Sequence, residues 1–167
     1  MEYVSLEMAK QIVKKQYEEA YIKLSLKIKG FIMPVVVWRD MGRRRAGVAY
    51  YDRYTIELNT NYLKSKDWEK FLYETPLHEL AHHISYQLYG ETGHKAVWKD
   101  VCYKLGLAGN RCHNFSTPEG VHFRKQERIA VLCDCEEGHT VSKTIYNRMK
   151  NGYRYRCRKC GKTLSFL

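Results

Sequence analysis

His78-Glu79-Leu80-Ala81-His82 is the stretch from which the rest of the sequence is interpreted. It lies in a run, residues 68–88, whose apolar side chains recur every three or four positions, a spacing that predicts a helix. Residues four apart on a helix share a face, so His78 and His82 can bind one metal ion. We expect zinc, with Glu79 taking the proton of a water on the metal.

A catalytic zinc site usually has three protein ligands and a water, so a third ligand is expected downstream. His94 is our candidate, because Gly90 and Gly93 can end the first helix and reverse the chain. The apolar run at 96–101 predicts a second helix that carries His94 back over the first. Glu91 is the alternative, because zinc hydrolases also use two histidines and a glutamate.

Composition limits the possible architectures. With 167 residues, of which 44% are hydrophobic, the chain can bury one ordinary core and carry a small appendage. No run approaches the roughly 18 apolar residues of a membrane helix, and residues 1–5 do not begin a signal segment. We therefore expect a cytoplasmic monomer without membrane contact, associated with the nucleoid if the source is prokaryotic. In that compartment, the six cysteines indicate metal ligands or buried thiols before disulfides.

The segments before the metal helix predict a mixed fold. Apolar spacing predicts a long amphipathic helix over 4–29, and β-branched residues predict a strand over 31–38. Residues 46–59 form two further strand patterns around a turn, and their free edge could bind an extended peptide. Asp67 is the predicted N-cap of the metal helix, in which Pro76 requires either a fresh start or a kink.

Some histidines, cysteines and tyrosines are left without a ligand pattern. We expect a packing or surface role for His83 and structural roles for Cys102, Cys112, His113 and His122. Tyr86 and Tyr89 could donate to a developing oxyanion, but the sequence does not choose between them.

The net charge of +11 suggests a polyanionic partner, usually nucleic acid, although a basic surface can also serve solubility alone. Most of the excess lies in residues 121–167, which hold eleven Lys and Arg against four Asp and Glu. A second basic segment, Arg43-Arg44-Arg45, either contacts phosphates or is a solvated turn.

The C-terminal region contains two short cysteine pairs, Cys133/Cys135 and Cys157/Cys160. Pairs that bracket about twenty residues are a strong signal for a structural zinc ribbon. Because the first pair is C-x-C and not C-x2-C, His139 could replace one of its cysteines as the fourth ligand. We prefer four sulfur ligands.

A hairpin is expected between the pairs, because Asn151-Gly152 is the strongest short turn signal. In the following strand, aromatic residues would occupy one face and guanidinium groups the other. Such a surface could bind phosphates and stack bases, although the tyrosines can equally pack the ribbon core. The expected nucleic-acid contacts are Arg148, Lys150, Arg154, Arg156, Arg158 and Lys159.

In order and spacing, these motifs resemble the SprT-like family, whose eukaryotic relatives include the DNA-dependent metalloprotease Spartan. The resemblance covers most of the chain. It is carried by Ala46-Gly47, Ile56-Glu57-Leu58-Asn59, Leu77 to His82, Gly93-His94 with Trp98, and the Cys-x-Cys and Cys-x-x-Cys-Gly tail. The metzincin pattern is not matched, because Ser85 stands where a glycine is needed.

The resemblance implies an α+β fold. Residues 1–122 would form a zincin-like core with a long N-terminal helix, a small antiparallel sheet and the H-E-x-x-H helix, and residues 123–167 a small β zinc ribbon. It implies one catalytic zinc on His78, His82 and His94, with Glu79 as the base, and one structural zinc in the ribbon.

The implied function is a zinc metallopeptidase that cleaves proteins bound or crosslinked to DNA. DNA, with single-stranded character, would recruit or activate it through the basic ribbon. One alternative is a non-catalytic zinc-containing adaptor that binds nucleic acid, or a transcription-associated factor. A zinc hydrolase acting on a small amide is a third possibility.

Overall fold

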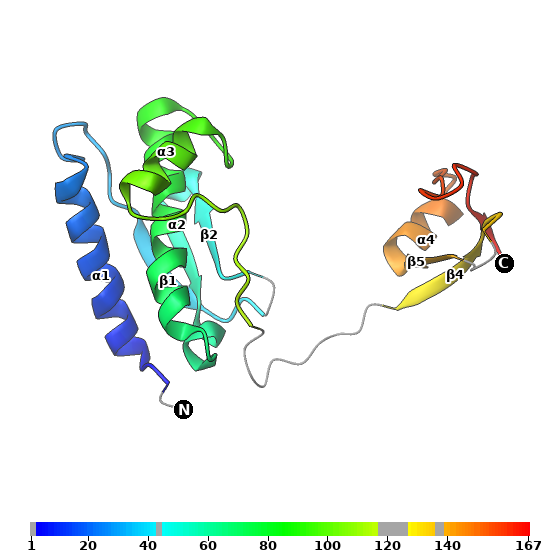
Figure 1. Ribbon diagram of the computed structural model, residues 1–167, viewed down its shortest axis with the longest axis horizontal. Coiled ribbons are helices and arrows are strands. Elements are labelled where there is room, and N and C mark those ends of the chain that lie inside the picture. The colour runs from blue at the N-terminus through cyan, green and yellow to red at the C-terminus, as the bar shows by residue number, and fades with distance from the viewer. Residues whose placement is uncertain (1–2, 43–44, 117–126, 136–138) are drawn as a thin grey trace. The chain divides into compact units, whose positions relative to one another are not determined.

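The computed structural model describes residues 3–42, 45–116, 127–135 and 139–167. The chain divides into two compact units, Met1–Val121 and His122–Leu167, and each is described here by itself (Figure 1). The boundary predicted after residue 122 and the arginines at 43 and 44 lie outside the described residues.

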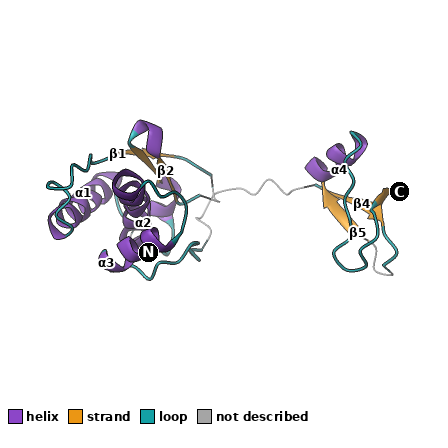
Figure 2. Cartoon of the chain, turned by 90° about the horizontal axis from the view of Figure 1, so that it is seen from above, coloured by secondary structure: helices purple, strands orange, loops and turns teal. Residues whose placement is uncertain are grey.

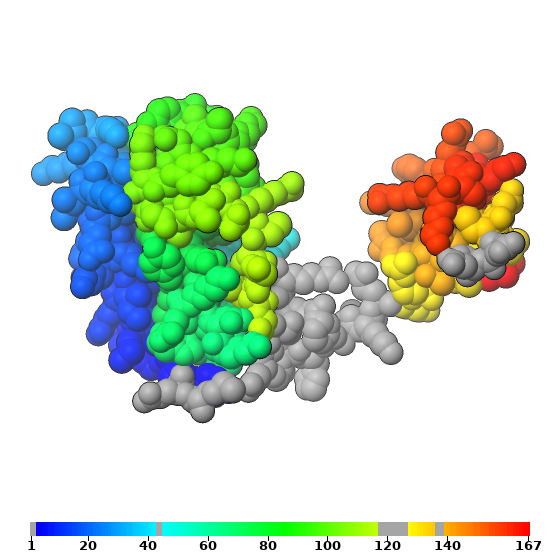
Figure 3. Space-filling model, in the orientation of Figure 1, coloured from blue at the N-terminus to red at the C-terminus, as the bar shows by residue number. Residues whose placement is uncertain are grey.

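The N-terminal unit is organised around α2 (Trp68–Tyr89), which contacts α1 (Leu6–Lys23), α3 (Ala96–Lys104) and the sheet. Figures 1 and 2 show α1 running alongside α2, and in Figure 3 the side chains of α1, in blue, close against the green surface beside them. The first helix ends earlier than the predicted residue 29. Leu24 caps it, and Ser25 adopts a left-handed conformation in the turn that follows.

The sheet of this unit is mixed, so the prediction of an antiparallel sheet was wrong in one strand. The expected hairpin is present, with β2 (Gly47–Tyr50) antiparallel to β3 (Thr55–Asn59). However, β1 (Val35–Arg39) pairs with β3 in parallel, giving the order β1-β3-β2. The first strand therefore lies at an edge, and Pro34 directly precedes it, where a missing N–H costs little.

Asn59, at the end of β3, holds the segment that crosses from one edge of the sheet to the other. Its buried side chain donates to the carbonyl oxygens of Gly42 (2.6 Å) and Arg45 (2.7 Å) and accepts from the N–H of Met41 (3.3 Å). The segment between β1 and β2 cannot pair in the sheet, because β3 lies between these two strands. The Asn59 side chain gives its backbone groups the hydrogen-bond partners that a strand would otherwise supply. One side chain thus supports this topology.

Pro76 lies inside a continuous α2, so no fresh helix starts there. Because proline has no N–H, the carbonyl of Leu72 loses its helical partner. Gln16 of α1 supplies a replacement, with Nε2 donating to that carbonyl at 3.0 Å. Tyr17, also on α1, donates its hydroxyl to the Pro76 carbonyl at 2.9 Å. The first helix therefore completes the hydrogen bonding of the second in the two turns that precede His78.

The C-terminal unit contains the sheet β5-β4-β6, formed by Arg128–Leu132 (β4), His139–Ser142 (β5) and Ser165–Phe166 (β6). It also contains α4 (Lys143–Lys150), so the expectation of a purely β ribbon was wrong. Ser142 caps α4 through its side chain, and Gly152, with φ of 87°, follows the helix end. Asn151-Gly152 thus ends a helix instead of turning a hairpin, and Arg148 and Lys150 lie on that helix.

The strand expected after Asn151 is also absent from the described structure, where only Arg156 pairs, in an isolated bridge with Thr163. The predicted alternation is present as alternating burial only over residues 155–158. Cys157 is buried and Tyr155 is partly buried against the small core, whereas Tyr153 is exposed. In the described part of the chain, no helix is long and apolar enough to span a bilayer.

Candidate active site

Three imidazoles converge on one point in the N-terminal unit. His78 and His82 share a face of α2, and His94 lies just before α3. The ring centroids are 5.0 Å apart for His78 and His82, 5.2 Å for His78 and His94, and 4.6 Å for His82 and His94. One ring nitrogen from each residue lies within 4.8 Å of the other two. All three can therefore bind one metal ion.

Trp98 holds the three rings in place. This buried residue, in the first turn of α3, has centroid distances of 4.8 Å to His78, 5.3 Å to His82 and 4.5 Å to His94. Gly90, in a left-handed conformation, ends α2 and allows the reversal that brings α3 to this position. The convergence expected from the two glycines and the second helix is thus present.

The protonation of the histidines fits metal binding. Burial lowers the pKa of His78 to about 4 and that of His82 to about 3, and neighbouring imidazoles act in the same direction. Burial, followed by the charge of Arg111, also lowers the pKa of His94. All three are therefore neutral near pH 7, and a metal ion displaces few protons from them. Three neutral imidazoles are a donor set that suits zinc.

Glu79 is buried beside this group, with 8% of its surface exposed. Burial raises the pKa of its carboxyl to about 8, against the opposing effect of a hydrogen bond with the backbone of Ala49. Strand β2 packs directly against this side chain. A Cβ added to Gly47 of that strand would lie only 2.9 Å from Glu79 Cγ. A nearby metal ion would favour the ionised carboxylate and so lower this pKa.

The alternative third ligand has another contact. Glu91 accepts a hydrogen bond from the backbone N–H of Trp98 at 3.2 Å and so caps the start of α3. Cys102 is buried, and burial raises the pKa of its thiol to about 12. Within the described ranges, the group that could hold a metal here consists of the three histidines, which leaves a coordination position open.

The histidines and Glu79 line a cleft of about 820 Å³. One part of its lining is β2 with Arg45, and another is the segment 106–113, which includes Arg111 and His113. His113 thus lines the candidate site, although the sequence suggested only a structural role for it. Tyr86 and Tyr89 do not line the cleft, whereas Tyr51 and Tyr73 do.

Comparison with known proteins agrees with this geometry. The model of the SprT-like family matches residues 10–119, which include all three histidines and Glu79. The chain belongs to the SprT-like family. The matched segment ends before the cysteine pairs.

Several SprT-like relatives are similar over most of their length, and each is named Protein SprT. The protein from Pseudomonas paraeruginosa is 34% identical over 141 residues, which are 81% of this chain and 82% of the relative. That from Pseudomonas fluorescens is 32% identical over 155 residues, 90% of this chain and 88% of the relative. One from Pseudomonas putida is 29% identical over 164 residues, 96% of this chain and 94% of the relative. No solved structure matches significantly.

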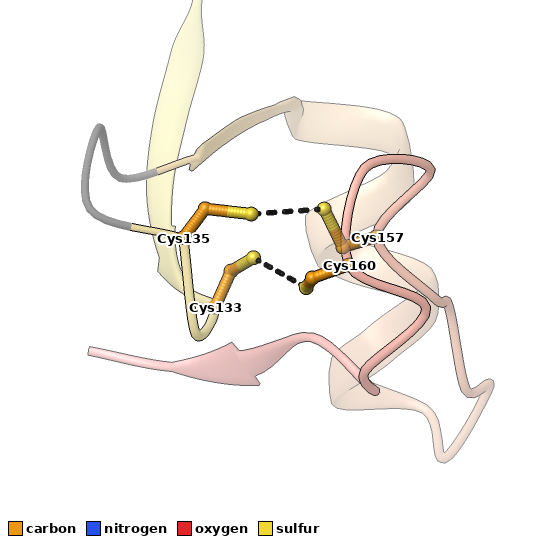
Figure 4. Close-up of side chains that lie close together, drawn as sticks. All are labelled: Cys133, Cys135, Cys157 and Cys160. Atoms are coloured by element: carbon orange, nitrogen blue, oxygen red, sulfur yellow. Dashed lines mark hydrogen bonds between the residues drawn. The ribbon is translucent and has the colours of Figure 1, made fainter.

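The C-terminal unit of this SprT-like chain brings four cysteines together. The Sγ atoms of Cys133 and Cys160 are 3.3 Å apart, and those of Cys135 and Cys157 are 3.7 Å apart (Figure 4). All four sulfurs lie within 4.8 Å of one another, which suits a closed tetrahedral zinc site. The alternative ligand, His139, instead pairs with Val131 in the sheet.

The thiols differ in how readily they lose a proton. Hydrogen bonds with the backbone of Cys160 and Lys159 lower the pKa of Cys157 to about 6. A hydrogen bond to Cys133 raises the pKa of Cys135. A zinc ion would therefore find Cys157 largely as the thiolate near neutral pH and would have to displace the proton of Cys135.

The six basic residues predicted to contact nucleic acid are all exposed. Arg148 and Lys150 belong to the last turn of α4, where Lys150 also lies over the ring of Tyr146. The other four follow the helix within residues 154–159, two of them before the second cysteine pair and two between its cysteines. All six basic residues thus lie in the C-terminal unit. They are on a helix and the loop after it, and not on the two strands of the expected hairpin.

Three supporting residues were missed by sequence reasoning. Gly47 gives β2 room beside Glu79, and Asn59 holds the crossing segment, but both had been noted only as part of the family resemblance. Tyr51, whose hydroxyl lies 3.4 Å from Nδ1 of His82, had no signal of its own. A tyrosine in a hairpin turn cannot be connected to a distant histidine without knowing how the hairpin packs.

Proposed function

We propose that this SprT-like chain is a zinc-dependent peptidase that cleaves proteins bound or crosslinked to DNA. The observation that carries the proposal is the group of three neutral imidazoles in an open cleft with Glu79 buried beside them. A closed structural site would need a fourth protein ligand, and it would have no use for a buried carboxyl at that position.

The chemistry follows from the donor set. Zinc bound by His78, His82 and His94 would act as a Lewis acid and lower the pKa of a bound water to about 7. Glu79 takes the proton of the attacking water and delivers it to the leaving amine. Ala49, through its backbone, keeps the Glu79 carboxyl in place for both transfers. Arg111 and His113 line the same cleft and can orient the substrate carbonyl.

Recruitment by DNA is the second element of the proposal. The chain has a net charge of +11, and the C-terminal unit exposes basic side chains on α4 and the loop after it. Such side chains bind phosphates without reading sequence, and their binding weakens steeply with salt. Single-stranded DNA is the preferred partner, because exposed tyrosine Tyr153 offers a ring for base stacking beside Arg154.

The test measures cleavage of a basic DNA-binding protein by the zinc-loaded chain, with and without single-stranded DNA. Glu79→Gln at matched zinc content should lose activity by about 100- to 10,000-fold, the usual contribution of a general base. Glu69→Gln is the matched control, an exposed glutamate on the same helix that does not line the cleft, and it should keep full activity. Raising the salt concentration several-fold should abolish the stimulation by DNA.

The adaptor alternative predicts a different result. If the wild-type chain and Glu79→Gln both bind zinc and DNA equally and neither cuts, the chain is a nucleic-acid-binding module. Cleavage that does not respond to DNA or to salt would instead retain the peptidase and refute recruitment by DNA.

A further inference from the structure

One hydroxyl group connects two segments that carry candidate metal ligands. The Tyr51 hydroxyl lies 3.4 Å from Nδ1 of His82, which is on α2. It also forms a hydrogen bond with the backbone of Gly93, which directly precedes His94. In this bond the Gly93 N–H donates and the phenol oxygen accepts.

We infer that Tyr51 is a positioning residue, which orients His82 and fixes the loop of His94 for metal binding. The inference deepens the proposed function, because it concerns the same metal site. A histidine that binds a metal through one ring nitrogen usually donates the other N–H to an oxygen, which fixes its tautomer and ring orientation. Tyr51 offers that oxygen to His82, on the Nδ1 side.

The remaining nitrogen of His82 then faces its neighbours. Nε2 of His94 and Nε2 of His78 lie 3.2 Å apart, so the Nε2 atoms are the ones that converge. With Nδ1 of His82 directed to the hydroxyl, its Nε2 is left for the metal ion. A phenol oxygen has two lone pairs, so it can accept from His82 and from Gly93 together.

The ring of Tyr51 is fixed by packing. It is stacked on Tyr86 at a centroid distance of 4.7 Å and contacts the edge of His83 at 5.7 Å. Tyr86 and His83 lie on α2, as does His82, whereas Tyr51 begins the 3-10 turn that joins β2 to β3. The hydroxyl is therefore held in position from both the hairpin and the helix.

His94 is the ligand that most needs this support. His78 and His82 are held by the backbone of one helix, whereas His94 follows Gly93, whose φ is 78°, in a short loop. Removing the hydroxyl leaves His82 free to change its tautomer and the loop free to move. Loss of such an outer partner typically costs about 10- to 100-fold in metal affinity.

The experiment measures metal binding without any substrate. The full chain is loaded with one equivalent of zinc, which the four thiols take, and is then titrated with Co²⁺. Absorption without thiolate charge-transfer bands reports Co²⁺ on the histidines. Tyr51→Phe should weaken this binding about 10- to 100-fold and alter the ligand-field bands. Tyr86→Phe, which keeps the stacked ring, is the matched control and should bind as the wild type does.

Two results would overturn the inference alone. One is Tyr51→Phe with wild-type affinity and spectrum. The other concerns the metal-free Tyr51→Phe chain, whose stability is measured by urea unfolding. If its loss of stability is large enough to account for the whole loss of metal affinity, the hydroxyl supports only the fold. A wild-type chain that binds no Co²⁺ at the histidines would overturn the metal site, and this inference and the proposed function with it.

Discussion

The two candidate metal sites of this chain are built in opposite ways. The three histidines are held by α2, α3 and the packing of Trp98, inside a unit that has an extensive buried core of its own. The four cysteines lie on loops of a unit whose buried residues are Val131, Val141, Met149, Cys157 and Leu164. The first site is therefore formed by the fold, whereas the second must help to form it.

This contrast separates two uses of a metal ion. A site that is prepared before the metal arrives can leave a position open, because the protein does not depend on the ion for its structure. A small unit with a minimal core depends on the binding energy of its metal, which for structural zinc is on the order of 10 kcal/mol. The three histidines, which leave a coordination position open, fit the first use, and the four cysteines, which form a closed set, fit the second.

The largest expected effect comes from removing the second cysteine pair. Cys157→Ser combined with Cys160→Ser should unfold the C-terminal unit, because its few buried residues cannot offset the loss of chain entropy. Hydrogen exchange should show the amides of β4 and β5 unprotected and those of α2 unchanged.

Two variants test the other half of this contrast. His94→Ala should lose the metal of the N-terminal unit but keep its amides protected. Cys112→Ser, at an exposed cysteine outside both groups, should change neither unit. Protected β4 and β5 amides in the double serine variant would break the comparison.

The next effect concerns the stability of the metal-free chain as pH changes. The carboxyl of Glu79 has a pKa of about 8 in the folded chain, against an ordinary value of 4.5, so the folded state prefers the protonated form. Its contribution is fully present below pH 4.5 and is lost as the pH rises toward 8. Glu79→Gln, which does not titrate, should become the more stable protein by up to about 1.4 kcal/mol per pH unit in that window.

Urea unfolding at several pH values measures this difference. Saturating zinc should shrink the difference, because a metal ion stabilises the ionised Glu79. A constant difference between Glu79→Gln and wild type across the window would show that Glu79 is not buried as described.

A smaller effect is expected where β2 meets Glu79. Gly47→Ala places a methyl group 2.9 Å from Glu79 Cγ and 2.9 Å from Thr75 Cγ2, so the carboxyl must move. Displacement of a catalytic group by about 1 Å can cost about 100-fold in activity. Peptidase assays should show this loss while zinc affinity remains unchanged.

A second substitution checks that the cause is crowding. Thr75→Ser removes Cγ2, one of the three atoms that the new methyl group would meet, and should restore part of the activity of Gly47→Ala. If Gly47→Ala is as active as the wild type, the strand does not fix the base.

The smallest effect is expected from a single charge in the C-terminal unit. Arg156→Gln should weaken single-stranded DNA binding a few-fold and lower the slope of log affinity against log salt by about 0.7, the value for one phosphate contact on a single strand. Titrations at several salt concentrations measure both. Lys27→Gln, at an exposed lysine in the N-terminal unit, should leave the slope unchanged, and an equal change would place DNA binding elsewhere.

Local signals were sufficient for the histidine site. The apolar period predicted α2 and α3, and the glycines at 90 and 93 predicted the reversal between them. Since His78 and His82 are fixed by helix geometry, only the third ligand required long-range reasoning, and the short loop limited the choice to His94 and Glu91. The structure brings His94 to the other two.

Long-range pairing could not be predicted. β1 pairs in parallel with β3, and Asn59 makes bonds with the crossing segment; both join residues that are separated in the sequence and that no local pattern connects. In the C-terminal unit, Asn151-Gly152 fits a hairpin turn and a helix end equally well, because both need a residue with positive φ. The spacing of Ile145, Tyr146 and Met149 would have favoured the helix.

The contact between α1 and Pro76 links assembly of the site to folding of the whole unit. Gln16 and Tyr17 reach across more than fifty residues of sequence to complete the hydrogen bonds around the proline, in the two turns that precede His78. Helix α2 is therefore finished only when the N-terminal helix has docked, a contact of high sequence separation that forms slowly. A partly synthesised or truncated chain lacks one of these partners, so the candidate metal site matures together with the complete N-terminal unit.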